Sequence, residues 1–121
     1  MEKQTFSGNY EADIASLNLR LRVSESFDLV SRQIMIGSHR AMLWFIDGFI
    51  KAGLMEKIMS FMMNADEKKL KTVGTTREFA DAFVPYVETE VVNGFDRFET
   101  FLFSGALGMI VDGFKEAIFI D

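Results

Sequence analysis

Cysteine is absent from this chain of 121 residues, and its absence excludes several kinds of chemistry together. Without a thiol there is no disulfide, no thiolate metal ligand and no Cys nucleophile. Histidine occurs once, as His39, in the stretch Gly37-Ser38-His39-Arg40, whose composition is typical of a turn. A metal site or a Ser-His-Asp arrangement needs partner residues that this context does not supply. We therefore predict a structural role for His39, and no catalytic or metal-binding residue.

Basic residues and long apolar runs are also scarce. Lys and Arg number 13 against 18 Asp and Glu, which gives a formal net charge of −5, and the basic residues are scattered. Nucleic-acid binding is not expected, because a phosphate backbone requires clustered positive charge. The longest unbroken apolar run, Ala41 to Ile46, falls far short of the ~20 residues of a spanning helix, and the N-terminus has no signal-peptide core. We expect a soluble chain, with any membrane contact made through a parent protein beyond residue 121.

The sequence contains no glycine-rich phosphate loop and no nucleophile elbow, so we predict no cofactor. Three aspartates, Asp47, Asp112 and Asp121, end predicted strands and could together hold Mg²⁺. However, Asp-Gly is also the usual composition of a tight turn. We favour the turn and a non-enzymatic protein, and keep a metal-dependent enzyme as the lesser alternative.

What the chain has in abundance is apolar material, at 49% of residues with 13 Phe and 8 Met. That is enough for the core of one domain, over residues 11–121, following a disordered N-terminus over residues 1–10. Two segments read as apolar run, polar turn, apolar run, the pattern of a β-hairpin. The first places strands at Phe27–Ile36 and Arg40–Ile46, and the second at Leu107–Val111 and Ala117–Ile120 around Asp112-Gly113.

The rest of the chain predicts about four helices and one further strand, Tyr86–Val92. Alternation of Leu17, Leu19 and Leu21 would fit a strand over Glu11–Val23, but a helical stripe also fits, and we predict a helix. Further helices are predicted over Phe49–Met63, from Thr75 to the stop at Pro85, and from a cap at Asn93 to Gly105, with residues 64–74 as a charged connector. Because helices lie between strands, the predicted fold is α+β, with a mixed sheet packed by helices.

The predicted helix over residues 49–63 is unusually rich in methionine. We assign most of its apolar stripe to the core. The stripe is wider than a core contact needs, and we assign the remaining apolar residues to a possible partner face, because Met packs well on adaptable surfaces. The residues of this possible partner face are Leu54, Met55, Ile58, Met59 and Met62. The open edge of the final hairpin is the alternative partner surface, because an exposed edge strand invites pairing.

Several motifs resemble the A subunits of the GerA family of spore germination proteins. Ser26–Val30 with Arg32, Ile36–Ala41 and Phe45–Ile50 are similar to that family's "DLV-x-R", "IGG-x-x-A" and "YIDGLV". Phe103–Gly105, Met109–Gly113 and Ala117–Asp121 are similar to "LLSG…LLIDG…ALIID", although Ser38 and Phe45 depart from the pattern. The positions on which the resemblance depends, all given a structural role, are Arg32, Gly37, Arg40, Asp47, Gly48, Gly105, Asp112 and Gly113.

The resemblance implies a membrane protein of the spore inner membrane that acts with B and C subunits. This chain would be the first subdomain of its cytosolic N-terminal region, on the spore-core side. Its role would be receptor assembly and signal coupling, through those subunits or through self-association. A small-molecule sensing domain, with a ligand held between sheet and helices, remains the alternative.

Overall fold

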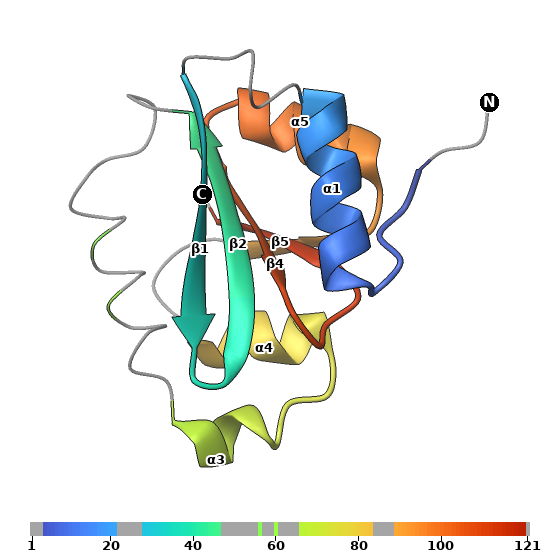
Figure 1. The fold of residues 1–121 in the computed structure, drawn as a ribbon. Helices are drawn as coiled ribbons and strands as arrows, with labels where there is room; N and C mark the ends of the chain where they lie inside the picture. Colours follow the sequence, from blue (N-terminus) through green and yellow to red (C-terminus); the bar gives the residue numbers. More distant parts are fainter. Residues whose placement is uncertain are drawn as a thin grey trace.

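The computed structural model describes residues 4–21, 28–46, 66–83 and 89–120, together with Glu56 and Ser60. In this part of the chain, helices and strands assemble around one sheet (Figure 1). The helices are α1 (Tyr10–Leu21), α3 (Glu67–Leu70), α4 (Thr76–Phe83) and α5 (Phe95–Phe103). The strands are β1 (Leu29–Ile36), β2 (His39–Ile46), β3 (Thr89–Val92), β4 (Leu107–Val111) and β5 (Ala117–Ile120). The predicted α+β class, with two hairpins and one further strand, is confirmed.

The strand order is β1-β2-β4-β5-β3, and every pairing in it is antiparallel. The prediction of a mixed sheet is therefore wrong for the described strands. Its premise was that a helix between two strands makes them parallel neighbours. The strands β3 and β4, which flank α5, do run parallel, but β5 lies between them and is antiparallel to both.

The final hairpin occupies the middle of the sheet. Strand β4 pairs with β2 on one side and with β5 on the other, and β5 also pairs with β3. All residues of β4 and β5 are buried, because helices cover both faces of the sheet. The prediction of an open edge on this hairpin is therefore wrong, and the outer strands of the sheet are β1 and β3.

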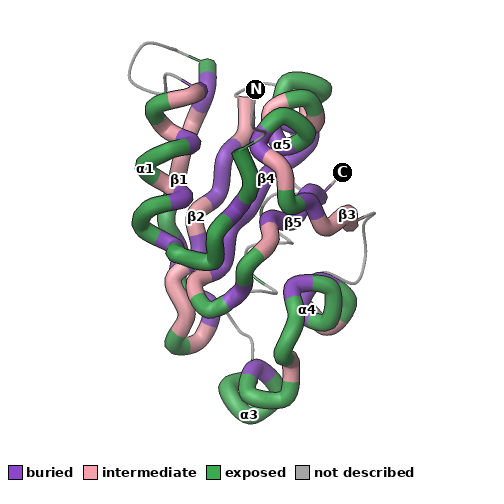
Figure 2. The backbone as a smooth tube through the Cα atoms, turned by 90° about the vertical axis from the view of Figure 1, so that its right-hand side faces the viewer, coloured by how far each residue is buried: buried purple, intermediate pink, exposed green. Residues whose placement is uncertain are grey.

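Two apolar clusters lie on opposite faces of the sheet. One joins Leu70 of α3 and Phe79 of α4 to Leu43 and Met109. The other joins Leu17 of α1 and Phe98 of α5 to Trp44, the single tryptophan, and Ile110. Neighbouring residues of one strand, such as Leu43 and Trp44, thus face different clusters, as the two-residue period of a strand requires. The result is three layers, with α1 and α5 on one face and α3 and α4 on the other. Figure 2 shows buried residues, in purple, along the strands β4 and β5.

The structure describes the N-terminal segment, for which disorder over residues 1–10 is predicted, from Gln4 onward. Within it, Phe6 is only 1% exposed. Phe6 N donates to Asn93 O at 2.8 Å, and Phe95 N donates to Gln4 O at 2.9 Å. The segment is mostly polar, which led to the prediction of disorder, but the burial of one large apolar side chain, Phe6, stabilises its contact with the rest of the chain.

Helix α1 confirms the helix predicted over residues 11–23 as far as Leu21, since residues 22 and 23 lie outside the described residues. It begins at Tyr10 behind an Asn9 cap, whose Oδ1 accepts from Ala12 N at 3.1 Å. The predicted cap at Thr75 is confirmed, since Thr75 Oγ1 accepts from Glu78 N at 3.1 Å. No helix in the described ranges is long and apolar enough to cross a membrane.

Helix α5 begins one residue later than predicted. Its N-cap is Gly94, which offers no side-chain bond, while the Asn93 carbonyl is engaged by the N-terminal segment. Its end confirms the predicted role of Gly105, which has φ +106°. Gly105 N donates to Leu102 O and Ala106 N to Phe101 O, the paired bonds of a Schellman motif.

The charged connector over residues 64–74 contains a short helix, α3, capped by Asp66, whose carboxylate accepts from Lys68 N at 3.0 Å. Most of the predicted helix over residues 49–63 lies outside the described residues. Only Glu56 and Ser60 are described there, and both are helical and exposed. The predicted stop at Pro85 also lies outside the described residues.

Candidate functional site

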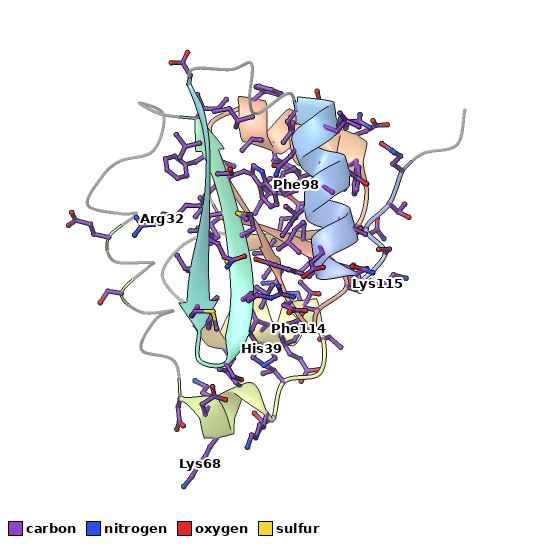
Figure 3. All side chains as sticks on the ribbon, in the orientation of Figure 1. Arg32, His39, Lys68, Phe98, Phe114 and Lys115 are labelled. Atoms are coloured by element: carbon purple, nitrogen blue, oxygen red, sulfur yellow. The ribbon has the colours of Figure 1, made fainter. Side chains whose placement is uncertain are left out.

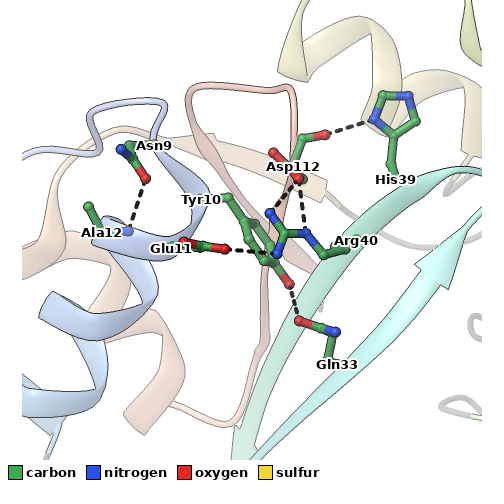
Figure 4. A network of polar contacts seen from close by, with 8 residues as sticks. All are labelled: Asn9, Tyr10, Glu11, Ala12, Gln33, His39, Arg40 and Asp112. Carbon is green, nitrogen blue, oxygen red and sulfur yellow. Dashed lines mark hydrogen bonds and ion pairs between the residues drawn. The ribbon is translucent and has the colours of Figure 1, made fainter.

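Two residues predicted as family positions, Arg40 and Asp112, meet at one end of the sheet. Arg40 follows the turn of the first hairpin, and Asp112 follows β4, which pairs with β2. Arg40 Nε and Nη2 donate to Asp112 Oδ2 at 3.1 and 3.0 Å, and Asp112 N donates to Arg40 O at 2.7 Å. Sheet register therefore places the two side chains together, and their ion pair joins the two hairpins (Figure 4).

Helix α1 contributes the other half of this polar network. Arg40 Nη1 donates to Glu11 Oε1 at 3.1 Å, and the guanidinium carbon lies 4.7 Å from the centre of the Tyr10 ring. Tyr10 Oη in turn donates to Gln33 Oε1 on β1 at 3.0 Å. We call Tyr10, Glu11, Gln33, Arg40 and Asp112 the Arg40 network. It connects α1, the first hairpin and the turn of the second hairpin.

The charges around Arg40 keep its guanidinium protonated. The hydrogen bonds that Arg40 donates to Glu11 and Asp112 raise the pKa of Arg40 above its already high ordinary value, so its guanidinium stays charged. Burial raises the pKa of Tyr10, partly opposed by the nearby Arg40 charge. Covalent catalysis needs a nucleophile with a general base within hydrogen-bond distance of it. A guanidinium paired with two carboxylates provides neither group. The arrangement can orient the three elements relative to one another, and a catalytic role has no support in it.

His39 lies beside the Arg40 network, where it joins the same two hairpins. It is the first residue of β2 and not, as predicted, part of the turn, because the turn takes only two residues. Its Nδ1 lies 2.8 Å from Asp112 O, and its ring centre is 5.9 Å from that of Phe114. The structural role predicted for His39 fits these contacts.

Gly37 is required by the first hairpin for two separate reasons. Its φ is +60°, a conformation that L residues with a Cβ rarely adopt. A Cβ on Gly37 would also lie 2.5 Å from Leu70 Cδ1 and 2.6 Å from Glu67 Oε1, so the turn packs directly against α3. Ser38 Oγ donates to Glu67 Oε2 at 3.3 Å across the same contact.

Replacing Gly37 by alanine is therefore expected to lower the free energy of unfolding by about 1–3 kcal/mol, the usual cost of a strained backbone position. Urea unfolding measures the change. Gly74→Ala is the matched control, because a Cβ at Gly74 meets no atom within 4 Å and its φ is not positive. Equal stabilities of the two variants would contradict the packing role given to Gly37.

Tyr10 gives a second prediction, at alkaline pH. Its pKa in the folded chain is raised above the ordinary value near 10.0, so the unfolded chain loses this proton first. The free energy of unfolding should fall as pH rises through and above about 10, and be unaffected by this group below that. Tyr10→Phe should flatten this alkaline slope, which urea unfolding across pH 8–11 would measure. An unchanged slope would show that burial of Tyr10 does not carry the effect.

The other predicted family positions are placed as follows. Arg32 is exposed on β1 (Figure 3), Gly105 ends α5, and Gly113 has φ +98° in the turn after β4. Asp47, Gly48 and the possible partner face (Leu54, Met55, Ile58, Met59 and Met62) lie outside the described residues.

A metal site finds no support in the described part of the chain, where no three His, Asp or Glu side chains gather closely enough to hold an ion. Of the three aspartates weighed for such a site, Asp47 and Asp121 lie outside the described residues. The third, Asp112, is hydrogen-bonded to Arg40.

Three residues of the Arg40 network, Tyr10, Glu11 and Gln33, were not predicted from the sequence. For Tyr10 and Glu11 the only local signal was a helix start, with Asn9 as the cap and acidic residues in the first turn.

This architecture is found in a protein of known structure. The fold is similar to the crystal structure of the N-terminal domain of the A subunit of the Bacillus megaterium spore germinant receptor GerK3, with a TM-score of 0.78 and 16% sequence identity. The match covers 100% of this chain and 49% of that one, so the chain spans about half the length of the solved domain. At this identity the likeness shows a shared fold.

The sequence itself shows the family. The model of the Bacillus/Clostridium GerA spore germination protein family matches residues 17–121, which is most of the chain. The chain belongs to the GerA spore germination protein family, as its motifs predicted. No curated protein sequence matches it.

Proposed function

We propose that this chain is part of the N-terminal domain of the A subunit of a spore germinant receptor. The family match over residues 17–121 and the likeness in fold to such a domain support this proposal. The domain is not an enzyme. It lies on the cytosolic, spore-core side of the spore inner membrane and belongs to a larger membrane protein.

Its role is receptor assembly and signal coupling with the B and C subunits. The observation that carries this role is the Arg40 network, which connects α1 to both hairpins through side chains that are mostly part-exposed. Such a network can pass a displacement of one element to the others, because its members bond to each other. Among the described residues, no buried side-chain nitrogen or oxygen lacks a partner. That is typical of a structural network and not of a site awaiting substrate.

The test is replacement of Arg40 by glutamine in the full-length protein in spores. Two quantities are measured: the amounts of B and C subunits that co-purify with the A subunit, and the rate of nutrient-triggered germination. Loss of co-purification would assign Arg40 to assembly. Retained co-purification with slower germination would assign it to coupling.

Arg97→Gln is the matched control. Arg97 pairs with Glu90 and lies 5.4 Å from the Phe101 ring centre, so it makes the same kinds of contact as Arg40 but outside the network. This variant should leave both quantities unchanged. Normal germination and assembly in the Arg40 variant would overturn the role given to the network, and normal germination after deletion of the whole gene would overturn the receptor assignment.

A further inference from the structure

The N-terminal residues Gln4–Phe6, which we call the strap, bind to the rest of the chain as an extended peptide would. Thr5 and Gly94 form an antiparallel bridge, flanked by the bonds from Phe6 N to Asn93 O and from Phe95 N to Gln4 O, at 2.8 and 2.9 Å. The contact is one isolated bridge between segments outside the sheet strands, and its main-chain bonds are of the kind that hold an extended peptide in strand addition. The strap belongs to none of the five sheet strands, so the sheet pairings do not depend on it.

One aromatic side chain anchors the strap. The ring centre of Phe6 lies 4.6 Å from that of Phe95 and 5.6 Å from that of Phe98, and Phe6 is 1% exposed. We call the surface formed by Asn93–Phe95 and Phe98 the strap groove. Main-chain pairing with one deeply inserted aromatic side chain is how peptide-binding grooves combine affinity with selectivity.

The connection from the strap to α1 is short and separately fastened. Ser7 N, Ser7 Oγ and Gly8 N all donate to the carboxylate of Asp13, at 2.8 to 3.3 Å. Gly8 has φ +89°, so the chain reverses at a residue with wide conformational freedom. A turn that glycine permits, between a peptide-like strap and a helix, can act as a hinge for the strap.

We propose that the strap groove is a docking site for an extended segment bearing an aromatic side chain, and that a second copy of this chain supplies the segment by exchanging residues 4–6. The structure shows that this segment fits, because the chain's own copy occupies the groove. The same contacts form whether the segment comes from the same chain or from another, as in domain swapping. Residues 7–9 link the strap to α1, so the chain's own strap is present at its groove at an effective concentration of about millimolar. Exchange between two copies therefore requires a weakened strap or a high local concentration of the protein.

The test uses a synthetic peptide of residues 1–9, labelled with a fluorophore, and the full chain carrying Phe6→Ala. The vacated groove should bind the peptide saturably, and the unaltered chain should bind it at least tenfold more weakly because its own strap competes. A peptide with Phe6→Ala should not bind. Leu19→Ala is the control chain, since Leu19 is 81% exposed on α1, and it should behave as the unaltered chain.

Absence of saturable binding to a folded Phe6→Ala chain, or equal binding of both peptides, would overturn the proposal. Hydrogen exchange of the unaltered chain decides the matter if that variant does not fold. The amides of Phe6 and Phe95 should exchange at least tenfold faster than those that pair β2 with β4, through local opening of the strap. Exchange at the same rate would overturn the proposal, because a strap that never opens alone admits no second segment.

Discussion

Replacement of Phe98 by alanine is expected to lower the free energy of unfolding by about 3–5 kcal/mol, the range typical of a buried Phe truncated in a core. Phe98 is fully buried where α5 meets the sheet. Its ring lies 5.6 Å from that of Trp44, at 90°, and 4.9 Å from that of Phe119. Its loss leaves a cavity bounded by three large rings, with Phe6 as the third, and these cannot all move to fill it.

Urea unfolding followed by tryptophan fluorescence measures this change directly, because Trp44 is the single tryptophan and contacts the altered side chain. Phe103→Ala is the matched control. Phe103 belongs to the same helix but is 52% exposed, so its truncation should change stability by less than about 1 kcal/mol. Similar losses in the two variants would mean that Phe98 does not anchor α5.

A valine in place of Gly108 is expected to lower the free energy of unfolding by about 1–3 kcal/mol or more, through overpacking. Gly108 lies in β4, where a Cβ would fall 2.5 Å from Phe98 Cζ and 3.3 Å from Phe119 Cε1. The φ of Gly108 is not positive, so the expected loss comes from contact and not from backbone strain. Phe98 has little room to yield, since it is itself fully buried.

A double-mutant cycle tests that explanation. Gly108→Ala should destabilise the otherwise unaltered chain but cost less in a chain with Phe98→Leu, because the shorter side chain leaves room for the added methyl group. Urea unfolding of the four proteins gives the interaction energy. Additive losses would contradict a direct clash between these two positions.

The hairpins were predictable because their signals are local. Gly37-Ser38 and Asp112-Gly113 interrupt apolar runs, and a tight turn needs those residue types wherever the hairpin lies in the sheet. The order of the strands was not local, since β4 pairs with a strand some seventy positions earlier in the sequence. Even so, β4 and β5 contain no polar side chain, which indicated burial on both faces and contradicted the predicted open edge of that hairpin.

The candidate site was predictable only in part, for the same reason. Arg40 and Asp112 were identified through family motifs at hairpin turns, and sheet register then brought them together. Tyr10 and Glu11 reach Arg40 from a helix whose position on the sheet no periodicity specifies. The helix itself could be predicted, but its docking depends on the burial of Leu17 and on the bond from Trp44 Nε1 to Asn18 Oδ1 at 2.9 Å.

The central place of the final hairpin has a consequence for synthesis on the ribosome. Strand β2 is complete at Ile46, but its neighbour β4 begins only at Leu107. At about 5–20 residues per second, a nascent chain therefore leaves one edge of an apolar strand without its native partner for several seconds. During that interval the early hairpin is open to pairing with other nascent chains, and a chaperone that shields strand edges should raise the yield of native protein.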